Sequence, residues 1–103
     1  MVAVVYTTMD NIQDARRLAK TLVDEKLVAC VNIIPKIESY YRWKGKVENA
    51  DEVVLICKTV DPNVKKTIQR IKSLHKYEVP DIIALPIVGG LKDYLDYIAK
   101  ETS

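Results

Sequence analysis

The sequence of 103 residues contains only one histidine, His75, and this scarcity limits the reactions that the chain could support. A nucleophile activated by a histidine base needs a third group that orients the base, and no such set can be assembled from this sequence. The loop after the first predicted strand, "YTTMDN", also lacks the glycine and arginine expected where a phosphate is cradled. We therefore predict that the protein is not an enzyme.

Long apolar runs are absent as well. No run approaches the eighteen residues of a membrane span, and the first ten residues, "MVAVVYTTMD", lack the positively charged segment of a signal peptide. The two cysteines, Cys30 and Cys57, lie in apolar strand-like runs and form no CxxC pair. We expect a soluble, cytoplasmic protein whose cysteines are buried reduced thiols, with coordination of Cu(I) by the pair as the alternative.

A strong excess of one charge sign is also missing. Sixteen basic residues stand against fourteen acidic ones, which gives a net charge of +2. Nucleic-acid binding usually requires a basic patch, and the aromatic motifs of RNA-binding sheets are not present, since the predicted central strands offer Tyr6 alone. The local lysine excess between residues 58 and 76 is typical of a solvated helix face. We expect neither a nucleic acid nor a membrane as a partner.

What is present is a regular alternation of apolar strands and amphipathic helices over one domain, residues 1–103. Two helices, separated by a strand pair, and a short terminal helix complete the order β-α-β-β-α-β-α. This order predicts the α+β, ferredoxin-like βαββαβ arrangement with both long helices on one side of the sheet. The predicted strands are residues 2–6, 27–34 with an extended continuation over 37–43 beyond Pro35, 52–59 and 81–88.

Local signals set the expected ends of these elements. Asp10 with Gln13 resembles a capping box that starts a helix running to about Lys26. Asp61 as N-cap and Pro62 at the first helical position start the second long helix. Lys44-Gly45 is a plausible hairpin turn. The pair Gly89-Gly90 before the last helix is a strand-to-helix turn, with an anion site as the alternative.

The strands are apolar on both faces, which a sheet covered by helices on one side does not require. In the run "EVVLICKT" (52–59), for example, neighbouring apolar residues point in opposite directions. Because a soluble monomer rarely exposes a large apolar face, we expect the second face to be buried against other copies of the chain. A doubly wound sheet is the alternative. The aromatics Tyr40, Tyr41 and Trp43 at the hairpin tip are expected at the same interface, or else folded back on their own helix.

Five segments of the chain resemble the CutA divalent-cation-tolerance proteins. They are "LVACVNIIP" (27–35), "SYYRWKGKVE" (39–48), "EVVLICKT" (52–59), "HKYEVPDIIALPI" (75–87) and "YLDYI" (94–98). The resemblance covers essentially the whole chain and implies a ferredoxin-like protomer that assembles into a homotrimer. It also implies a role linked to copper and other divalent metals, and a trimeric shape similar to that of the PII signalling proteins.

The resemblance also implies where a metal could bind. Some members bind copper through a cysteine near the end of the first strand and two adjacent histidines, and these positions are Tyr6, Leu74 and His75 here. The family's "HPYE" is His75-Lys76-Tyr77-Glu78 in this chain, so only one histidine is retained. We expect His75 and Glu78 as candidate ligands of Cu²⁺ or another divalent cation, with no organic cofactor. The alternative is that His75 caps the end of the second helix.

A second hypothesis follows from the PII-like shape. A regulatory trimer could bind a small anion or metabolite in clefts between subunits, and Lys58, Arg42 and Tyr77 are the candidate residues for such clefts. Lys58 is the most informative of them, since it is a charged residue at the end of an otherwise apolar strand.

Overall fold

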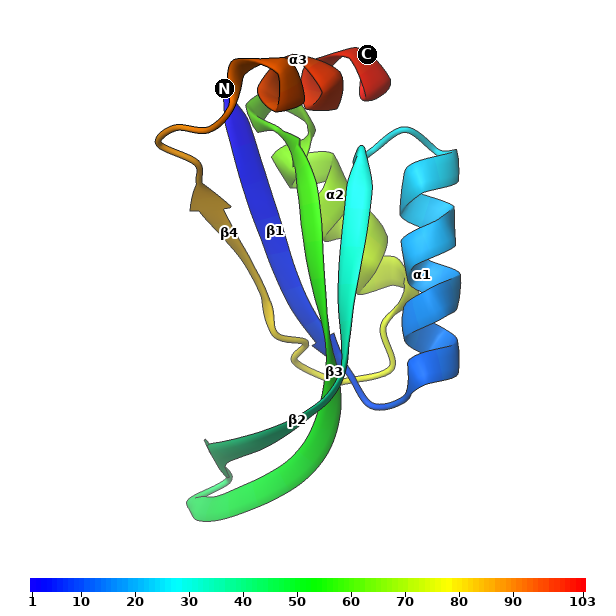
Figure 1. Ribbon diagram of the computed structural model, residues 1–103. Coiled ribbons are helices and arrows are strands. Elements are labelled where there is room, and N and C mark those ends of the chain that lie inside the picture. The colour runs from blue at the N-terminus through cyan, green and yellow to red at the C-terminus, as the bar shows by residue number, and fades with distance from the viewer.

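The computed structural model describes residues 1–103 as four strands and three helices (Figure 1). In chain order these are β1 (Val2–Met9), α1 (Ile12–Asp24), β2 (Cys30–Trp43), β3 (Lys46–Val60), α2 (Asp61–Leu74), β4 (Ile82–Pro86) and α3 (Lys92–Glu101). The predicted order of elements is confirmed. None of the helices is long and apolar enough to cross a membrane.

The strands form one antiparallel sheet in the order β2-β3-β1-β4. The helices α1 and α2 lie on the same side of this sheet (Figure 1). This arrangement is the ferredoxin-like fold that the sequence predicts. The alternative of a doubly wound sheet is wrong, because no strand pair is parallel and the second side carries neither long helix.

The helix starts differ from the prediction by one residue each. The N-cap of α1 is Asn11 rather than Asp10, and its side-chain oxygen accepts a hydrogen bond from the backbone N–H of Asp14 at 2.8 Å. In α2 the N-cap is Val60, with no side-chain cap, and Asp61 is the first helical residue. An acidic residue in the first turn still stabilises α2 through the helix dipole.

The strand ends also differ from the prediction. β2 begins at Cys30 rather than Leu27, because Leu27 belongs to the motif that ends α1. Its N–H donates to the carbonyl of Leu22, and Lys26, with φ of 60°, donates to the carbonyl of Val23. β3 begins at residue 46 rather than 52, and β4 covers 82–86 rather than 81–88.

The β2–β3 hairpin continues beyond the body of the protein as an arm, residues 35–51, which lengthens the molecule to 44 Å (Figure 1). The pairing register shifts between Ile34 and Ile37, so Pro35 produces a bulge rather than a break in β2. The predicted Lys44-Gly45 turn is confirmed, with φ of 49° and 82° at its two residues. The aromatic side chains do not fold back on a helix: Tyr40 is 68% exposed, and Tyr41 and Trp43 are also exposed.

The core lies between the sheet and the two long helices. We call this side of the sheet the covered face; its central residues are Ala3, Val5 and Thr7 of β1 and Leu55, Cys57 and Thr59 of β3, all buried. They pack toward apolar residues of the helices, namely Ala15, Leu18 and Leu22 of α1 and Ile71 of α2. The burial of these side chains is the main stabilising contribution to a protomer of this size.

The opposite side of the sheet is the open face. Strand alternation places on it Val4 and Tyr6 of β1, Cys30 and Ile34 of β2, Ile56 and Lys58 of β3, and Ile83 and Leu85 of β4. Three of these apolar side chains are about half exposed: Ile34 at 42%, Ile83 at 52% and Leu85 at 46%. Of the three helices only α3 lies near the open face, and it lies at one end of that face, at the top of Figure 1. Both faces of the sheet are therefore apolar, as predicted, and one is largely uncovered.

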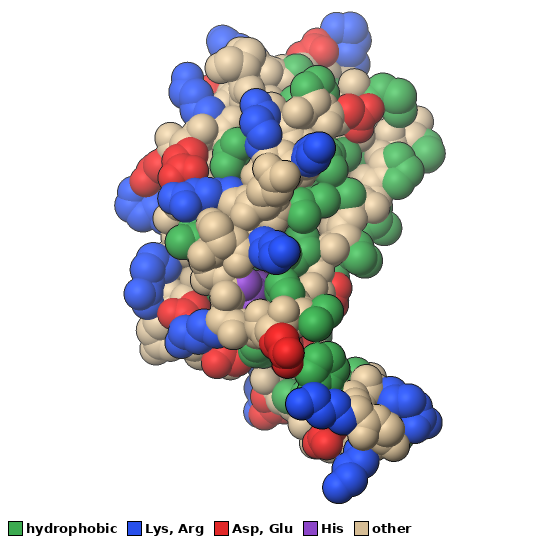
Figure 2. Space-filling model, turned by 180° about the vertical axis from the view of Figure 1, so that it is seen from behind, with side chains coloured by type: hydrophobic (Ala, Val, Ile, Leu, Met, Phe, Trp, Pro, Cys, Tyr) green, Lys and Arg blue, Asp and Glu red, His purple; other side chains and the backbone are tan.

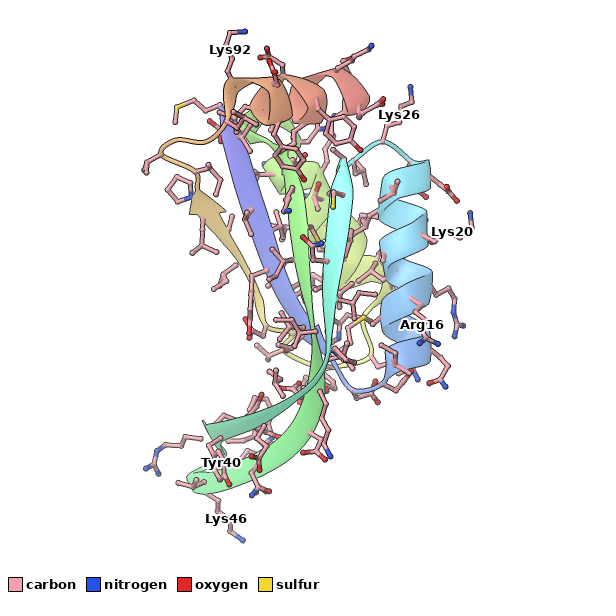
Figure 3. All side chains as sticks on the ribbon, in the orientation of Figure 1. Arg16, Lys20, Lys26, Tyr40, Lys46 and Lys92 are labelled. Carbon is pink, nitrogen blue, oxygen red and sulfur yellow. The ribbon has the colours of Figure 1, made fainter.

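The helical side of the molecule, seen from behind in Figure 2, is mainly charged, unlike the apolar open face. Lys and Arg are interspersed with Asp and Glu over it, and hydrophobic side chains gather along one edge (Figure 2). Arg16, Lys20 and Lys26 project from α1 and the loop after it into solvent (Figure 3). This surface has no single-sign patch of the kind that binds nucleic acid.

Candidate functional sites on the open face

His75 is held by contacts on both ring nitrogens. It occupies the C-cap of α2, the position that the helix-cap alternative predicted. Its Nε2 lies 2.6 Å from the backbone oxygen of Thr8, and its Nδ1 accepts a hydrogen bond from the backbone N–H of Tyr77 at 3.2 Å. A ring with its proton on Nε2 satisfies both contacts. His75 therefore ties the end of α2 to the end of β1, and a metal could bind it only by replacing one of these contacts.

Tyr77 connects this histidine to the sheet. Its ring lies 4.6 Å from that of His75, and its hydroxyl donates a hydrogen bond to Oε2 of Glu52 at 3.0 Å. Burial and the bond to Glu52 raise the pKa of the Tyr77 hydroxyl well above its ordinary value. Glu78, the other predicted ligand, is exposed on the loop after α2.

A pair of carboxyl groups gathers at this end of the open face. Partial burial, and then the charge of Glu52, raise the pKa of Asp81, while His75 acts in the opposite direction. Burial and the charges of Asp81 and Glu52 raise the pKa of the Tyr6 hydroxyl. We call Tyr6, Glu52, Tyr77 and Asp81 the acidic end of the open face. Its field favours cations and disfavours anions.

The residues of a single chain do not form a complete metal site. No group of three or more histidine, cysteine, aspartate or glutamate side chains converges in the structure. Divalent transition metals usually take three or four protein ligands, and Tyr6 and Leu74 stand where two of them would be implied by the resemblance. One protomer alone therefore does not fit a tightly held copper ion.

The other end of the open face carries a positive charge instead of carboxylates. A cavity of about 400 Å³, which we call the lysine cavity, lies between the sheet and α3. Its lining is mainly apolar, and Lys58 is its one charged residue. The Nζ of Lys58 donates to the hydroxyl of Tyr94 at 3.3 Å and lies 5.2 Å from the centroid of that ring.

The three predicted cleft residues do not come together in one chain. Lys58 lies near the end of β3. Tyr77 instead contacts Glu52, which is six residues before Lys58 on the same strand. Arg42 is exposed on the arm, where it pairs with Val47. At about 3.3 Å per residue, roughly 36 Å of β3 lies between Val47 and Lys58 along the strand. Any cleft containing all three would need more than one copy of the chain.

The two cysteines point to opposite faces of the sheet. Cys30 pairs with Lys58 on the open face, whereas Cys57 belongs to the covered face. Cys57 is fully buried, as predicted, and burial raises its thiol pKa to about 12, so it stays protonated. Cys30 is only partly buried. Both are free thiols, and their orientation does not favour joint coordination of Cu(I).

Three residues of these sites escaped the sequence interpretation: Glu52, Asp81 and Tyr94. Glu52 and Asp81 each precede an apolar strand run, in phase with its open-face residues, and this spacing could have placed both at one edge. Tyr94 lies 36 residues after Lys58, and only the packing of α3 against the sheet brings them together.

The fold and the sheet face that neither long helix covers define a small protein of the ferredoxin-like class. Comparison with known proteins identifies its family. The family model described as CutA1 divalent ion tolerance protein matches residues 3–101. The chain belongs to this family, as the resemblance implied.

Relatives and solved structures agree with this assignment. The divalent-cation tolerance protein CutA of Thermus thermophilus is 45% identical over 102 residues, which is 99% of each chain. A chloroplastic CutA of Arabidopsis thaliana is 44% identical over 96% of this chain, which spans only about half, 54%, of the plant protein. Structures of CutA from Thermus thermophilus and Archaeoglobus fulgidus superpose over the full length of both chains, with TM-scores of 0.96 and 0.97 at 45% and 39% identity. The names of the Thermus and Archaeoglobus proteins refer to tolerance of divalent cations.

Proposed function

We propose that the protein is a cytoplasmic homotrimer that binds divalent cations, copper among them, and contributes to tolerance of these ions without catalysing a reaction. Its membership of the divalent ion tolerance family supports the role in handling cations. The free thiols of Cys30 and Cys57 are compatible with a reducing compartment. Relatives named as chloroplastic and periplasmic occupy other compartments, so fractionation of cells expressing the chain tests this point.

The open face supports the assembly. Ile34 on β2 and Ile83 and Leu85 on β4, at the two edges of the sheet, expose apolar area on the same face, and an apolar face of this kind is usually covered by a partner. The number of subunits in this assembly, three, is what the family resemblance implies. Light scattering at micromolar concentration should give three times the chain mass of 11.7 kDa. A stable mass of one chain would contradict the proposed assembly.

Assembly would also supply what one chain lacks as a metal site. A threefold assembly repeats each ligand, so His75 and Glu78 of one protomer can be joined by side chains of another. The carboxylates of Glu52 and Asp81 give the acidic end a field that attracts cations. These two carboxylates are the feature of the chain that best supports cation binding near His75.

Calorimetric titration with Cu²⁺ tests the candidate ligands. We expect His75→Ala to weaken Cu²⁺ binding by about tenfold or more, because losing a ligand should cost at least as much affinity as losing a residue that only orients a ligand. Because the alanine also removes two structural hydrogen bonds, His75→Gln serves as the matched variant, which keeps an N–H donor for the carbonyl of Thr8. Glu78→Gln should weaken binding less. Equal Cu²⁺ affinities in wild type and both His75 variants would remove His75 from the site.

A second candidate function is a PII-like regulatory trimer that binds a small anion in a cleft beside Lys58. One observation favours it: Lys58 is partly buried in an apolar cavity and forms no ion pair within the chain. Thermal-shift screening against metals, nucleotides and organic anions separates the candidates. Stabilisation by metals alone favours the first, and stabilisation by anions alone favours the second.

A further inference from the structure

We propose that Lys58 of one copy of the chain pairs with the carboxylates of Glu52 and Asp81 on the next copy, so that the open faces meet with unlike ends together. This inference deepens the proposed assembly and rests on it. It names the residues that fix how the copies are placed against one another. It also gives Lys58 a carboxylate of the chain itself, in place of the small anion of the second candidate function.

The charges of the open face carry the first step. Lys58, Glu52 and Asp81 take part in none of the ion pairs within the chain. The two carboxylates lie close enough together for the charge of Glu52 to raise the pKa of Asp81. An unpaired charge becomes strongly unfavourable when a partner covers it and removes its water. Burial of the open face between copies therefore requires an opposite charge at each end.

One chain cannot supply these opposite charges to itself. Glu52 and Lys58 lie six residues apart on the same strand, which is about 20 Å. Asp81 precedes Ile82, which is aligned with Leu55 through β1. Asp81 is therefore displaced from Lys58 by about 13 Å along the strands and by two strand spacings across them. A contact between Lys58 and either carboxylate must join two chains.

The two unlike ends fit a closed ring of copies. In such a ring each copy presents one patch to the copy before it and a different, complementary patch to the copy after it. The open face has two patches of this kind, Lys58 at one end and the acidic end at the other. Three copies joined in this way form three identical pairs. Contacts between like ends would instead bring equal charges together, which is disfavoured.

The apolar side chains of the open face fit the same contact. Ile83 and Leu85 occupy the stretch of β4 from the acidic end to the level of Lys58, and both are about half exposed. The lysine cavity is also lined mainly by apolar residues. Charged groups around an apolar patch set the register and the choice of partner more than the affinity. We therefore expect the apolar contacts to hold the copies together and the charged pairs to align them.

Exchange of the two charges tests the pair. Lys58→Glu should raise the dissociation constant of the assembly by about thirtyfold or more, because it sets a negative charge against the acidic end. Asp81→Lys should also raise it. The double variant that carries both changes should recover at least about tenfold of the loss, since opposite charges meet again. Sedimentation of the full chain over a dilution series measures each constant, and circular dichroism confirms folding.

Lys65→Glu is the matched control. Lys65 is exposed on α2, on the helical side of the sheet, and forms no ion pair in the chain. Reversal of its charge alters the net charge of the chain as much as Lys58→Glu does. The dissociation constant of the assembly should stay within about twofold of the wild-type value, because exposed charges contribute little.

Mixing of the two single variants gives a second measurement. In a ring of three that contains both Lys58→Glu and Asp81→Lys chains, two of the three contacts bring opposite charges together. The mixture should therefore assemble at least about fivefold more tightly than either variant alone. If Lys58→Glu does not fold, Lys58→Met and Asp81→Asn replace the reversed charges. Their combined loss should then be smaller than the sum of the two single losses.

Three results would overturn the inference. Assembly that is unchanged in Lys58→Glu would mean that no carboxylate of another copy lies at Lys58. Losses in the single variants without recovery in the double variant or in the mixture would assign Lys58 another partner. In both cases a wild type of three times the chain mass leaves the proposed assembly standing. A wild type with the mass of one chain would overturn the assembly and this inference together.

Discussion

The two faces of the sheet are built from the same strands and have different roles. On the covered face Val5, Leu55 and Cys57 have no exposed area, because α1 and α2 pack over them. On the open face Ile83 and Leu85 of β4, the strand next to β1, are about half exposed. The covered face thus stabilises the protomer, whereas the open face keeps apolar area exposed.

The open face itself has two unlike ends. At the acidic end, burial and the charge of Glu52 raise the pKa values of Tyr6, Tyr77 and Asp81. At the other end, Lys58 lies alone in an apolar cavity beneath α3. One continuous surface therefore favours cations at one end and anions at the other, and about 20 Å of β3 separates Glu52 from Lys58.

The largest effect is expected from placing a charge on the open face. Leu85→Glu should abolish assembly and reduce the mass found by light scattering to one chain, because a buried unpaired carboxylate at an interface costs several kcal/mol. The protomer should stay folded by circular dichroism, since Leu85 is 46% exposed in it. The matched control is Val23→Glu on α1, which changes a side chain of similar exposure, 41%, and should leave the assembly intact. An unaltered mass in Leu85→Glu would contradict a partner on the open face.

The next largest effect compares neighbouring residues of β3 on opposite faces. In the Leu85→Glu background, Leu55→Ala should lower the free energy of unfolding by about 2–5 kcal/mol, because it leaves a cavity in the core. Ile56→Ala in the same background should lower it by only about 1 kcal/mol, since Ile56 is partly exposed. Urea titration followed by circular dichroism measures both. Equal losses would mean that the two faces contribute alike to the protomer.

Strand alternation explains why the fold could be predicted from sequence. The two-sided apolar pattern of residues 52–59 correctly indicates a sheet with a second apolar face, because side-chain direction repeats every two residues. The arm shows the limit of this signal. Residues 46–51, "KVENAD", carry no apolar pattern, yet they continue β3 because they pair with β2 through backbone hydrogen bonds.

The sites were less predictable than the fold. His75 was singled out because it is the only histidine, but nothing local revealed that Thr8, 67 residues earlier, contacts its ring. Likewise, the partner of Tyr77 is Glu52, and the partner of Lys58 is Tyr94. Such pairs depend on strand register and on loop geometry, neither of which composition or periodicity determines.

A smaller effect is expected from two threonines of the covered face. Thr59 donates a hydrogen bond to the carbonyl of Leu27 at 2.6 Å, whereas the buried hydroxyl of Thr7 has no partner. Thr59→Val should therefore lower the free energy of unfolding by about 1 kcal/mol, and Thr7→Val should raise it by up to about 1 kcal/mol. Both residues are fully buried, so each variant controls for the change of shape in the other. A loss of stability in Thr7→Val would show that its hydroxyl has a partner.

The smallest effect is a pH dependence that distinguishes the acidic end from the helical surface. Because the pKa of Asp81 is raised above 3.8, the folded state holds this proton more tightly than the unfolded chain. Its contribution to stability is therefore greatest below pH 3.8 and is lost as the pH rises through the folded pKa. Asp81→Asn should consequently gain stability relative to wild type between about pH 4 and 7, within the roughly 0.5 kcal/mol typical of exposed sites.

Asp14 on α1 is the matched residue, because its pKa is shifted in the opposite direction from that of Asp81. Lys76 at 2.8 Å, with Asn11 and Arg17, lowers the pKa of its carboxyl, so its contribution is present above pH 3.8 and lost as the pH falls. Asp14→Asn should lose stability relative to wild type at neutral pH and approach it in acid. Urea titrations of both variants from pH 3.5 to 7 test the pair. If the stability difference between variant and wild type changed with pH in the same direction for both variants, the acidic end and the helical surface would not differ in how they respond to negative charge.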